Sequence, residues 1–338
     1  MATLLDNALP DSRLYLSAIS NISTKIQSKI GQFFTPIALS QSSTSETFMH
    51  GESSTFSSLN DGQFSQWQAL LEERTGMYIN ISHRSLLESN VIIRMREIGC
   101  PDVDEYYKNV CSKPDGIVEW SILLDRIMVQ ETRFYRNAES LELFANYLEE
   151  KLLNTSGKTQ TQAINIWSVG CSSGEEPYTL AILCQEVLNT LQSHCSFGIT
   201  ATDICLPVLA KAREGIYNAR KLLDLKSELI DNYFDALDGN KFEIKQPLKK
   251  NVCFSMANMI DIEKSPLRNM DVIYCQNVLI YFRKERKKII LDSLVERLAP
   301  GGLLIIGQGE ALDWHNSLVS RVPDNQTLAY IRQTTQEH

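Results

Sequence analysis

The sequence predicts an α/β protein with a doubly wound sheet and a small antiparallel β insertion, preceded by an all-helical domain. Three observations carry this prediction. From about residue 162 onward, short apolar strands alternate with helices, as in sheets with crossover connections. Between residues 64 and 128 only helical periodicity occurs. The turn signal Asp238-Gly239, followed by the alternating stretch FEIKQPLKK, interrupts the strand–helix rhythm and predicts an inserted hairpin at about 217–251.

These patterns divide the 338-residue chain into four parts. Residues 1–62 are expected to be a flexible extension, because Leu39–Gly62 is rich in serine and threonine and poor in apolar residues. Residues 63–137 form the all-helical domain and 138–161 a linker helix. Residues 162–338 form the sheet domain, which carries the insertion.

The expected elements follow in order along the chain. The helical domain contains helices at about 64–76, 83–99, 103–111 and 115–128. In the second of these helices the apolar side chains recur at helical spacing and are expected to face a core: Leu87, Val91, Met95 and Ile98. The expected strands of the sheet domain are Ile164–Val169, Ser196–Ala201, Val252–Met256, Val272–Tyr274 and Gly302–Ile306.

Composition and charge exclude several classes of protein. The chain has 33 Lys and Arg against 41 Asp and Glu, a formal charge of −8, which argues against general binding to nucleic acid or to an anionic membrane. The eight cysteines show no metal-type spacing, and Cys184, Cys253 and Cys275 lie in apolar runs typical of small core residues. No apolar run approaches the roughly 20 residues of a membrane span. A cytoplasmic protein without a metal site is therefore expected.

The stretch Ile164–Leu183 reads as a buried strand, a glycine-containing turn and an apolar helix. Gly170 and Gly174 permit a sharp turn and a close approach of a ligand to the backbone. Such a unit builds a nucleotide pocket at the carboxyl end of a sheet. Glu175 and Glu176, in the first helical turn, disfavour a pyrophosphate and favour a cationic or neutral adenosine-type ligand. The alternative is an ordinary strand-to-helix connection.

Polar residues also end the next two strands. Thr202-Asp203 follows the second strand, where a carboxylate can accept both hydroxyls of a ribose. Asp203 as the N-cap of a helix at 206–213 is the competing interpretation. Asn258-Met259 closes the third strand and offers an amide able to contact adenine and an apolar side chain to cover its ring. A plain turn remains the alternative there.

Two further segments carry candidate binding residues. The loop Met128–Asn137 mixes polar and cationic groups with two aromatic rings and suits a ligand lid, with a solvated turn as the alternative. The segment Tyr274–Phe282 offers polar groups at the end of the fourth strand and then Tyr281, whose ring face stabilises a cation. For Tyr281 the alternative is a buried Tyr–Phe pair.

In this order and spacing, the motifs resemble the chemotaxis-receptor glutamate methyltransferases of the CheR type. The resemblance rests on WSVGCSSGEEPYTLA, the Thr202-Asp203-Ile204 step, CQNVLIYF and GGLLIIGQGEAL. ETRFYR also looks like that family's loop ending in Thr-x-Phe-Phe-Arg. The likeness extends from about Phe64 to the carboxyl terminus and implies a Rossmann-like domain that binds S-adenosyl-L-methionine, with S-adenosyl-L-homocysteine as product.

The resemblance implies roles for individual residues. Together with the strand ends, it gives the cofactor pocket as Gln130, Thr132, Arg136, Gly170, Glu176, Asp203, Asn258, Met259, Cys275, Gln276 and Asn277. Arg136 and Tyr281 match the residues closest to the reacting centre and are the expected catalytic pair. Gln130 stands where an asparagine is usual, and Gln276 stands where relatives often carry an arginine, which removes a fixed cation beside the cofactor.

The implied partner is the cytoplasmic helical bundle of a methyl-accepting chemotaxis receptor, in a pathway for swimming or for pilus-driven movement. Basic residues near helix 83–99 offer a face for this acidic partner, with a solvated mixed-charge face as the alternative: His83, Arg84, Arg94 and Arg96. The inserted hairpin resembles a subdomain that docks a receptor peptide by strand addition. A non-catalytic adaptor that binds the same cofactor, and a nucleic-acid methyltransferase, are the competing functions.

Overall fold

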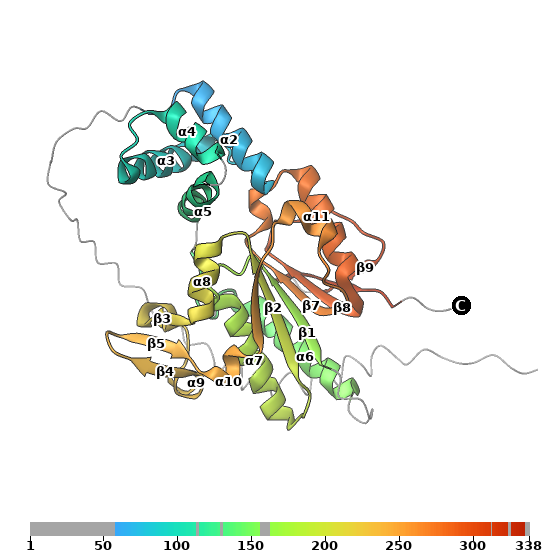
Figure 1. The fold of residues 1–338 in the computed structure, drawn as a ribbon. Coiled ribbons are helices and arrows are strands. Elements are labelled where there is room, and N and C mark those ends of the chain that lie inside the picture. The colour runs from blue at the N-terminus through green and yellow to red at the C-terminus, as the bar shows by residue number, and fades with distance from the viewer. Residues whose placement is uncertain are drawn as a thin grey trace, which may run out of the picture.

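The computed structural model of the chain describes residues 58–112, 115–128, 131–155, 163–311, 313–323 and 326–334. Most of the extension expected at 1–62 lies outside these residues, as does Gln130. In the described part the chain forms an all-helical domain, a seven-stranded sheet with helices on both faces, and a separate three-stranded sheet (Figure 1). The predicted fold class is confirmed.

The helical domain consists of α2 (Asp61–Thr75), α3 (Arg84–Ile98), α4 (Val103–Cys111) and α5 (Asp115–Ile127). A capping box starts α2, in which Asn60 and Gln63 exchange backbone-to-side-chain hydrogen bonds. Of the predicted core residues of α3, Leu87, Val91 and Met95 are buried. The prediction for Ile98 is wrong: this residue is 41% exposed and is the last residue of α3.

The charged residues of the helical domain pair largely with one another. Arg94 donates from Nε and Nη2 to the two carboxylate oxygens of Glu119, both at 2.8 Å, and Tyr106 donates to the same carboxylate at 2.7 Å. Arg84 forms an ion pair with Asp61 at 2.5 Å. Because both guanidinium groups are neutralised within the domain, this face is one of mixed charge.

The main sheet has the strand order β6-β2-β1-β7-β8-β10-β9. Its parallel strands are β1 (Ile164–Val169), β2 (Phe197–Asp203), β6 (Val252–Met256), β7 (Met270–Cys275) and β8 (Leu298–Ile306). These are the five predicted strands. The sequence did not reveal the antiparallel strands β9 (Val319–Arg321) and β10 (Leu328–Arg332). They are short, and they are defined by their partners, since β10 pairs with β8 and β9 pairs with β10.

Each face of the sheet has its own hydrophobic core. One core lies beneath α6 (Ala138–Thr155) and α7 (Glu175–Leu191), and the other beneath α11 (Lys284–Arg297) and the helical domain. Successive residues of β1 serve opposite faces, since Ile166 belongs to the first core and Trp167 to the second. Cys184 and Cys275 are buried as predicted, but Cys253 is exposed, because it lies on β6 at the edge of the sheet.

The insertion is a small sheet of order β3-β5-β4, built from β3 (Ile216–Asn218), β4 (Phe234–Leu237) and β5 (Lys241–Ile244). The predicted hairpin is β4–β5, and the helix α9 (Ser227–Tyr233) precedes it. The third strand, β3, was not predicted, since three residues are too few to show an alternating pattern. A 3-10 helix, η3 (Ala219–Leu222), follows β3.

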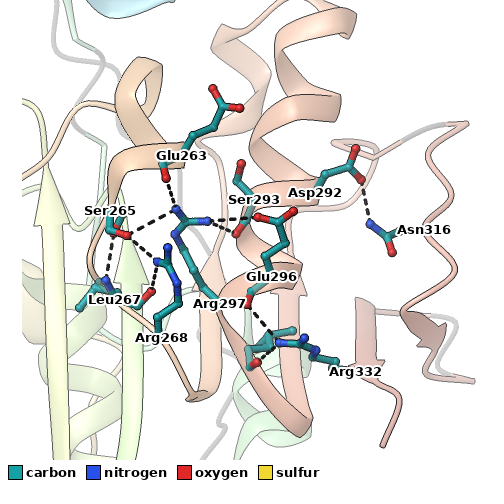
Figure 2. Close-up of polar contacts among 11 residues, drawn as sticks. Glu263, Ser265, Leu267, Arg268, Asp292, Ser293, Glu296, Arg297, Asn316 and Arg332 are labelled. Carbon is teal, nitrogen blue, oxygen red and sulfur yellow. Dashed lines mark hydrogen bonds and ion pairs between the residues drawn. The ribbon is translucent and has the colours of Figure 1, made fainter. Parts of the chain in front are cut away.

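A buried arginine ties α11 to the loop before β7. Arg297 is 1% exposed, and its guanidinium donates to the carbonyl oxygens of Ser293 at 2.6 Å and Glu263 at 2.9 Å (Figure 2). Burial of this cation lowers its pKa from the ordinary value. These carbonyl oxygens compensate in part for the burial of the charge, because they satisfy both terminal nitrogens while the buried Nε has no hydrogen-bond partner. Within the described residues, no helix combines the length and the apolar character needed to cross a membrane.

Candidate active site

A cavity of about 250 Å³ opens at the carboxyl ends of the parallel strands. Its walls come from the turns after β1, β2, β6 and β7, from residues 131–137, and from Thr75 and Met77 of the helical domain. In the strand order, β2 lies on one side of β1 and β7 on the other. This reversal of direction is where open α/β sheets bind their ligands.

The turn between β1 and α7 depends on two glycines. Gly170 has a φ of 71°, and a Cβ there would lie 2.3 Å from Val278 Cγ2. Gly174, the N-cap residue of α7, has a φ of 95°, and a Cβ there would lie 2.8 Å from the hydroxyl of Tyr217. Any side chain at either position would be strained and would collide with its neighbour. The turn is therefore packed between the β7 loop and the insertion.

Glu176 brings a carboxyl group to the cavity wall from the first turn of α7. Its Oε1 accepts a hydrogen bond from the hydroxyl of Ser168 at 2.7 Å. Burial raises the pKa of Glu176 to about 8, while Ser168 and the charge of Arg136 act in the opposite direction. A bound cation would lower this pKa, so the group favours a positively charged ligand.

Asp203 lies at the end of β2 and lines the same cavity. Its Oδ2 accepts the backbone N–H of Ser172 and its Oδ1 that of Cys205, each at 2.9 Å. Asp203 thereby joins the turns after β1 and β2. The N-cap interpretation is wrong, because the N-cap residue of α8 (Leu206–Glu214) is Cys205. Each carboxylate oxygen keeps a lone pair for a hydroxyl group in the cavity.

Asn258 and Met259 line the cavity after β6. Asn258 donates from Nδ2 to the carbonyl oxygen of Arg74 at 2.7 Å, and its Oδ1 accepts the backbone N–H of Ile260 at 3.2 Å. It therefore caps the 3-10 helix η4 (Met259–Lys264) and joins it to α2. One amide hydrogen of Asn258 remains for a ligand.

The loop 131–137 lies over the cavity with Thr132, Arg136 and Asn137 among its lining residues. Arg136 is exposed and donates to the carbonyl oxygen of Glu131 at 2.7 Å. The two rings that the sequence suggested for a lid serve another purpose. Phe134 and Tyr135 are 0% and 6% exposed and belong to the core beneath α6 and α7. They hold the loop down while its polar residues face the cavity.

The end of β7 separates neighbouring residues by face. Tyr274, Gln276 and Asn277 line the cavity, whereas Cys275 is 0% exposed and belongs to the core on the other side of the sheet. The expectation that Cys275 lines the pocket is therefore not met. Alternation along a strand is the reason, since consecutive side chains point to opposite faces.

Tyr281 ends the short helix η5 (Leu279–Tyr281) and lines the cavity. The helical domain holds it in place, because the backbone N–H of Tyr78 donates to its carbonyl oxygen at 2.8 Å. Burial raises the pKa of the Tyr281 hydroxyl, and the charge of Arg136 acts against this shift. Arg136 and Tyr281 thus interact electrostatically within one cavity.

Glu310 supports the loop after β7 and was not singled out from the sequence. Its carboxylate, in a residue 2% exposed, accepts the backbone N–H groups of Gly307 at 2.9 Å and of Asn277 and Ile280 at 3.1 Å. Burial raises its pKa, and these three donors oppose the shift. An acid within the apolar segment GGLLIIGQGEAL was the available signal, since buried acids need such partners.

The structure therefore gathers most of the predicted site residues around one cavity. Those lining it are Thr132, Arg136, Gly170, Glu176, Asp203, Asn258, Met259, Gln276, Asn277 and Tyr281. Carboxylates, amides and a tyrosine ring suit a cationic adenosine-type cofactor, with Asp203 available to a ribose and Glu176 to a positive charge.

A doubly wound sheet with a cavity at its topological switch point defines a nucleotide-binding domain of the Rossmann-like class. Comparison with protein families gives the finer assignment. Residues 130–328 match the SAM binding domain of CheR methyltransferases, and residues 62–128 match the all-alpha domain of CheR methyltransferases. The chain belongs to the CheR methyltransferase family and has an S-adenosylmethionine-binding domain.

Individual relatives agree over most of their length. Over 248 residues the chain is 33% identical to the chemotaxis protein methyltransferase of Borreliella burgdorferi. These residues make up 72% of this chain and 87% of that protein. With chemotaxis protein methyltransferase 1 of Pseudomonas aeruginosa the identity is 29%, over 75% and 91% of the two chains. With the chemotaxis protein methyltransferase of Escherichia coli it is 29%, over 75% and 85%.

Proposed function

We propose that this protein transfers a methyl group from S-adenosylmethionine to glutamate side chains on the cytoplasmic part of a chemoreceptor, forming carboxyl O-methyl esters. Membership of the CheR family supports the cofactor and the reaction class. The single observation that carries the assignment to this chain is the presence of Arg136 and Tyr281 on one cavity with the carboxylates Glu176 and Asp203. The named relatives are chemotaxis methyltransferases, which supports the receptor substrate.

The proposed chemistry needs no general base, because a glutamate carboxylate is already ionised at neutral pH. When bound, the cofactor supplies an electrophilic methyl group on a sulfonium. Arg136, exposed at the cavity, pairs with the incoming carboxylate and orients it. The ring of Tyr281 flanks the reacting methyl group and stabilises its positive charge.

Exclusion of water favours this reaction, because water stabilises the separated charges of the two reactants. The buried rings of Phe134 and Tyr135 hold the loop 131–137 close to the cavity, which limits access of solvent. Alignment of the reactants then provides most of the acceleration.

We further propose that the protein works in the cytoplasm and that its small sheet docks a receptor peptide by strand addition. β4 is an edge strand of that sheet, and Asp235, Ala236 and Leu237 on it are exposed.

The proposed pathway controls swimming or pilus-driven movement. Deletion of the gene, followed by swimming and surface-spreading assays, separates these two behaviours.

The test of the proposed function uses a methyl-labelled cofactor, the purified chain and membranes that contain the receptor. Treatment with alkali should release the label as volatile methanol, because esters are cleaved by base and methylated nitrogen is not. Label that stays non-volatile contradicts the ester assignment. Binding of the cofactor without any transfer would favour the adaptor, and transfer to added nucleic acid would favour a nucleic-acid methyltransferase.

A further inference from the structure

Lys221 of the insertion contacts both the cofactor-domain helix α7 and the loop 131–137. Its Nζ lies 3.0 Å from Oε1 of Glu175 and also donates a hydrogen bond to the carbonyl oxygen of Thr132. The backbone N–H of Phe134 donates to the carbonyl oxygen of Lys221 at 3.4 Å. One residue of η3 therefore holds two walls of the cavity together.

The partner carboxylate is strongly buried. The side chain of Glu175 is 1% exposed, against 36% for that of Lys221, and Glu175 starts α7 beside the cavity residue Glu176. Its other oxygen, Oε2, accepts the hydroxyl of Ser173 at 2.7 Å. Removing the ammonium group would leave a buried carboxylate without its counter-ion. The loss of one partner from a buried ion pair is strongly destabilising, because it leaves an uncompensated charge. The start of α7 would then rearrange.

Further contacts attach the insertion to the same two walls. The hydroxyl of Tyr217 donates to the carbonyl oxygen of Ser173 at 2.8 Å. The ring of Phe134 packs edge-to-face on Tyr217 and Phe234, with ring centres 4.9 and 5.3 Å apart. Yet among the described residues that line the cavity, none comes from the insertion. The insertion supports the cavity from outside.

We propose that Lys221 is a positioning residue through which the inserted sheet sets the affinity of the cavity for its cofactor. The ion pair with Glu175 and the hydrogen bond to Thr132 hold the loop and α7 in the arrangement that binds. Because coupling between two parts of a protein is reciprocal, occupation of the cavity must in turn stabilise the insertion. The proposal rests on the proposed function for the identity of the cofactor.

Calorimetry with S-adenosylhomocysteine on the full chain tests whether Lys221 sets the affinity of the cavity for its cofactor. Lys221→Met should weaken binding about tenfold, within the usual range of such couplings. Lys221→Arg, which keeps the cation, should recover most of the affinity. Arg220→Met removes the exposed cation next in sequence and should bind like the native protein. Equal affinities for Lys221→Met and Arg220→Met would overturn the proposal.

Hydrogen exchange on the native chain tests whether occupation of the cavity stabilises the insertion. This measurement does not depend on the folding of any variant. Addition of S-adenosylhomocysteine should slow exchange at 216–222 and 234–237, although no described residue there lines the cavity. Protection of 131–137 alone, with the insertion unchanged, would refute the coupling. Absence of any binding to the native chain would instead contradict the proposed function.

Discussion

Asn137 donates a hydrogen bond from its side-chain amide to Oε1 of Gln276, a residue 139 positions further along the chain. The contact joins the residue after Arg136 to the end of β7. Gln276 is 8% exposed, so the bond is largely shielded from solvent. An arginine at this position would have donors only and could not accept this bond. The glutamine is therefore matched to Asn137 in this chain.

Loss of this bond should loosen the loop 131–137. Gln276→Leu leaves the Asn137 amide unpaired, which costs about 1 kcal/mol and should weaken cofactor binding about fivefold. Calorimetry on Gln276→Leu, Asn137→Ala and the double variant measures the effect. The two single effects should not add, because both remove the same bond. Full additivity would show that the pair does not act as a unit.

Glu310→Gln should destabilise the protein and slow transfer. The introduced NH₂ group replaces one acceptor oxygen where three backbone N–H groups converge, so we expect a loss of about 2 kcal/mol in the free energy of unfolding. Urea unfolding measures this loss. Because the loop that carries Tyr281 is displaced, kcat should fall by a larger factor than cofactor affinity. Glu285→Gln, at an exposed position of α11, serves as the control.

Cofactor affinity should depend on pH through Glu176. The pKa of its carboxyl group is about 8 in the folded protein, against an ordinary value of 4.5, so at neutral pH the group is mostly protonated. A cationic ligand favours the ionised form, and binding below pH 8 must release a proton. Affinity should therefore rise with pH up to about 8 and then level off.

Calorimetry in buffers of different ionisation enthalpy detects the released proton, and Glu176→Gln should abolish both the proton release and the pH dependence of the affinity.

The effect of Glu176 on the stability of the fold has the opposite dependence on pH. Between pH 4.5 and 8 the native state holds more protons on Glu176 than the unfolded state does, so this group's contribution to stability falls as pH rises. A native protein whose affinity is constant over this interval would contradict the role of Glu176.

Arg136→Ala should reduce transfer at least as strongly as cofactor binding. If Arg136 orients the acceptor carboxylate, its loss misplaces the nucleophile, and kcat should fall about 100-fold. The assay is methyl transfer to receptor membranes, beside calorimetry with S-adenosylhomocysteine. Arg133, three residues earlier, pairs with Asp224 at 2.9 Å, and Arg133→Ala controls for loss of a loop cation. Unchanged turnover in Arg136→Ala would remove Arg136 from the mechanism.

Arg297→Lys should unfold at lower denaturant concentration than the native chain although the positive charge is kept. A lysine cannot reach the carbonyl oxygens of both Ser293 and Glu263 with fork geometry, and we expect a loss of about 2 kcal/mol. Equilibrium unfolding in urea measures it. Arg268→Lys, an exposed neighbour in Figure 2 that also donates to backbone carbonyls, should have little effect.

Most helices and strands could be predicted from the sequence, because the patterns that indicate them are local. Five parallel strands, four helices of the first domain and α6 follow from runs of apolar residues and from their period. The strands β3, β9 and β10 were missed, because each is at most five residues long and is defined by its partner strand. Ile98 and Cys253 were assigned to the core on local pattern alone, and both are exposed.

By itself, the sequence determined the class of domain and the strand ends at which polar residues gather, since the carboxyl ends of parallel strands share one edge of the sheet. Only the tertiary structure decided which of those residues face the cavity. It separates Tyr274 from Cys275 by strand alternation, and it brings Lys221 to Glu175 and Glu310 to Asn277. These contacts join segments distant in sequence, and their energy comes from burial that no local pattern records.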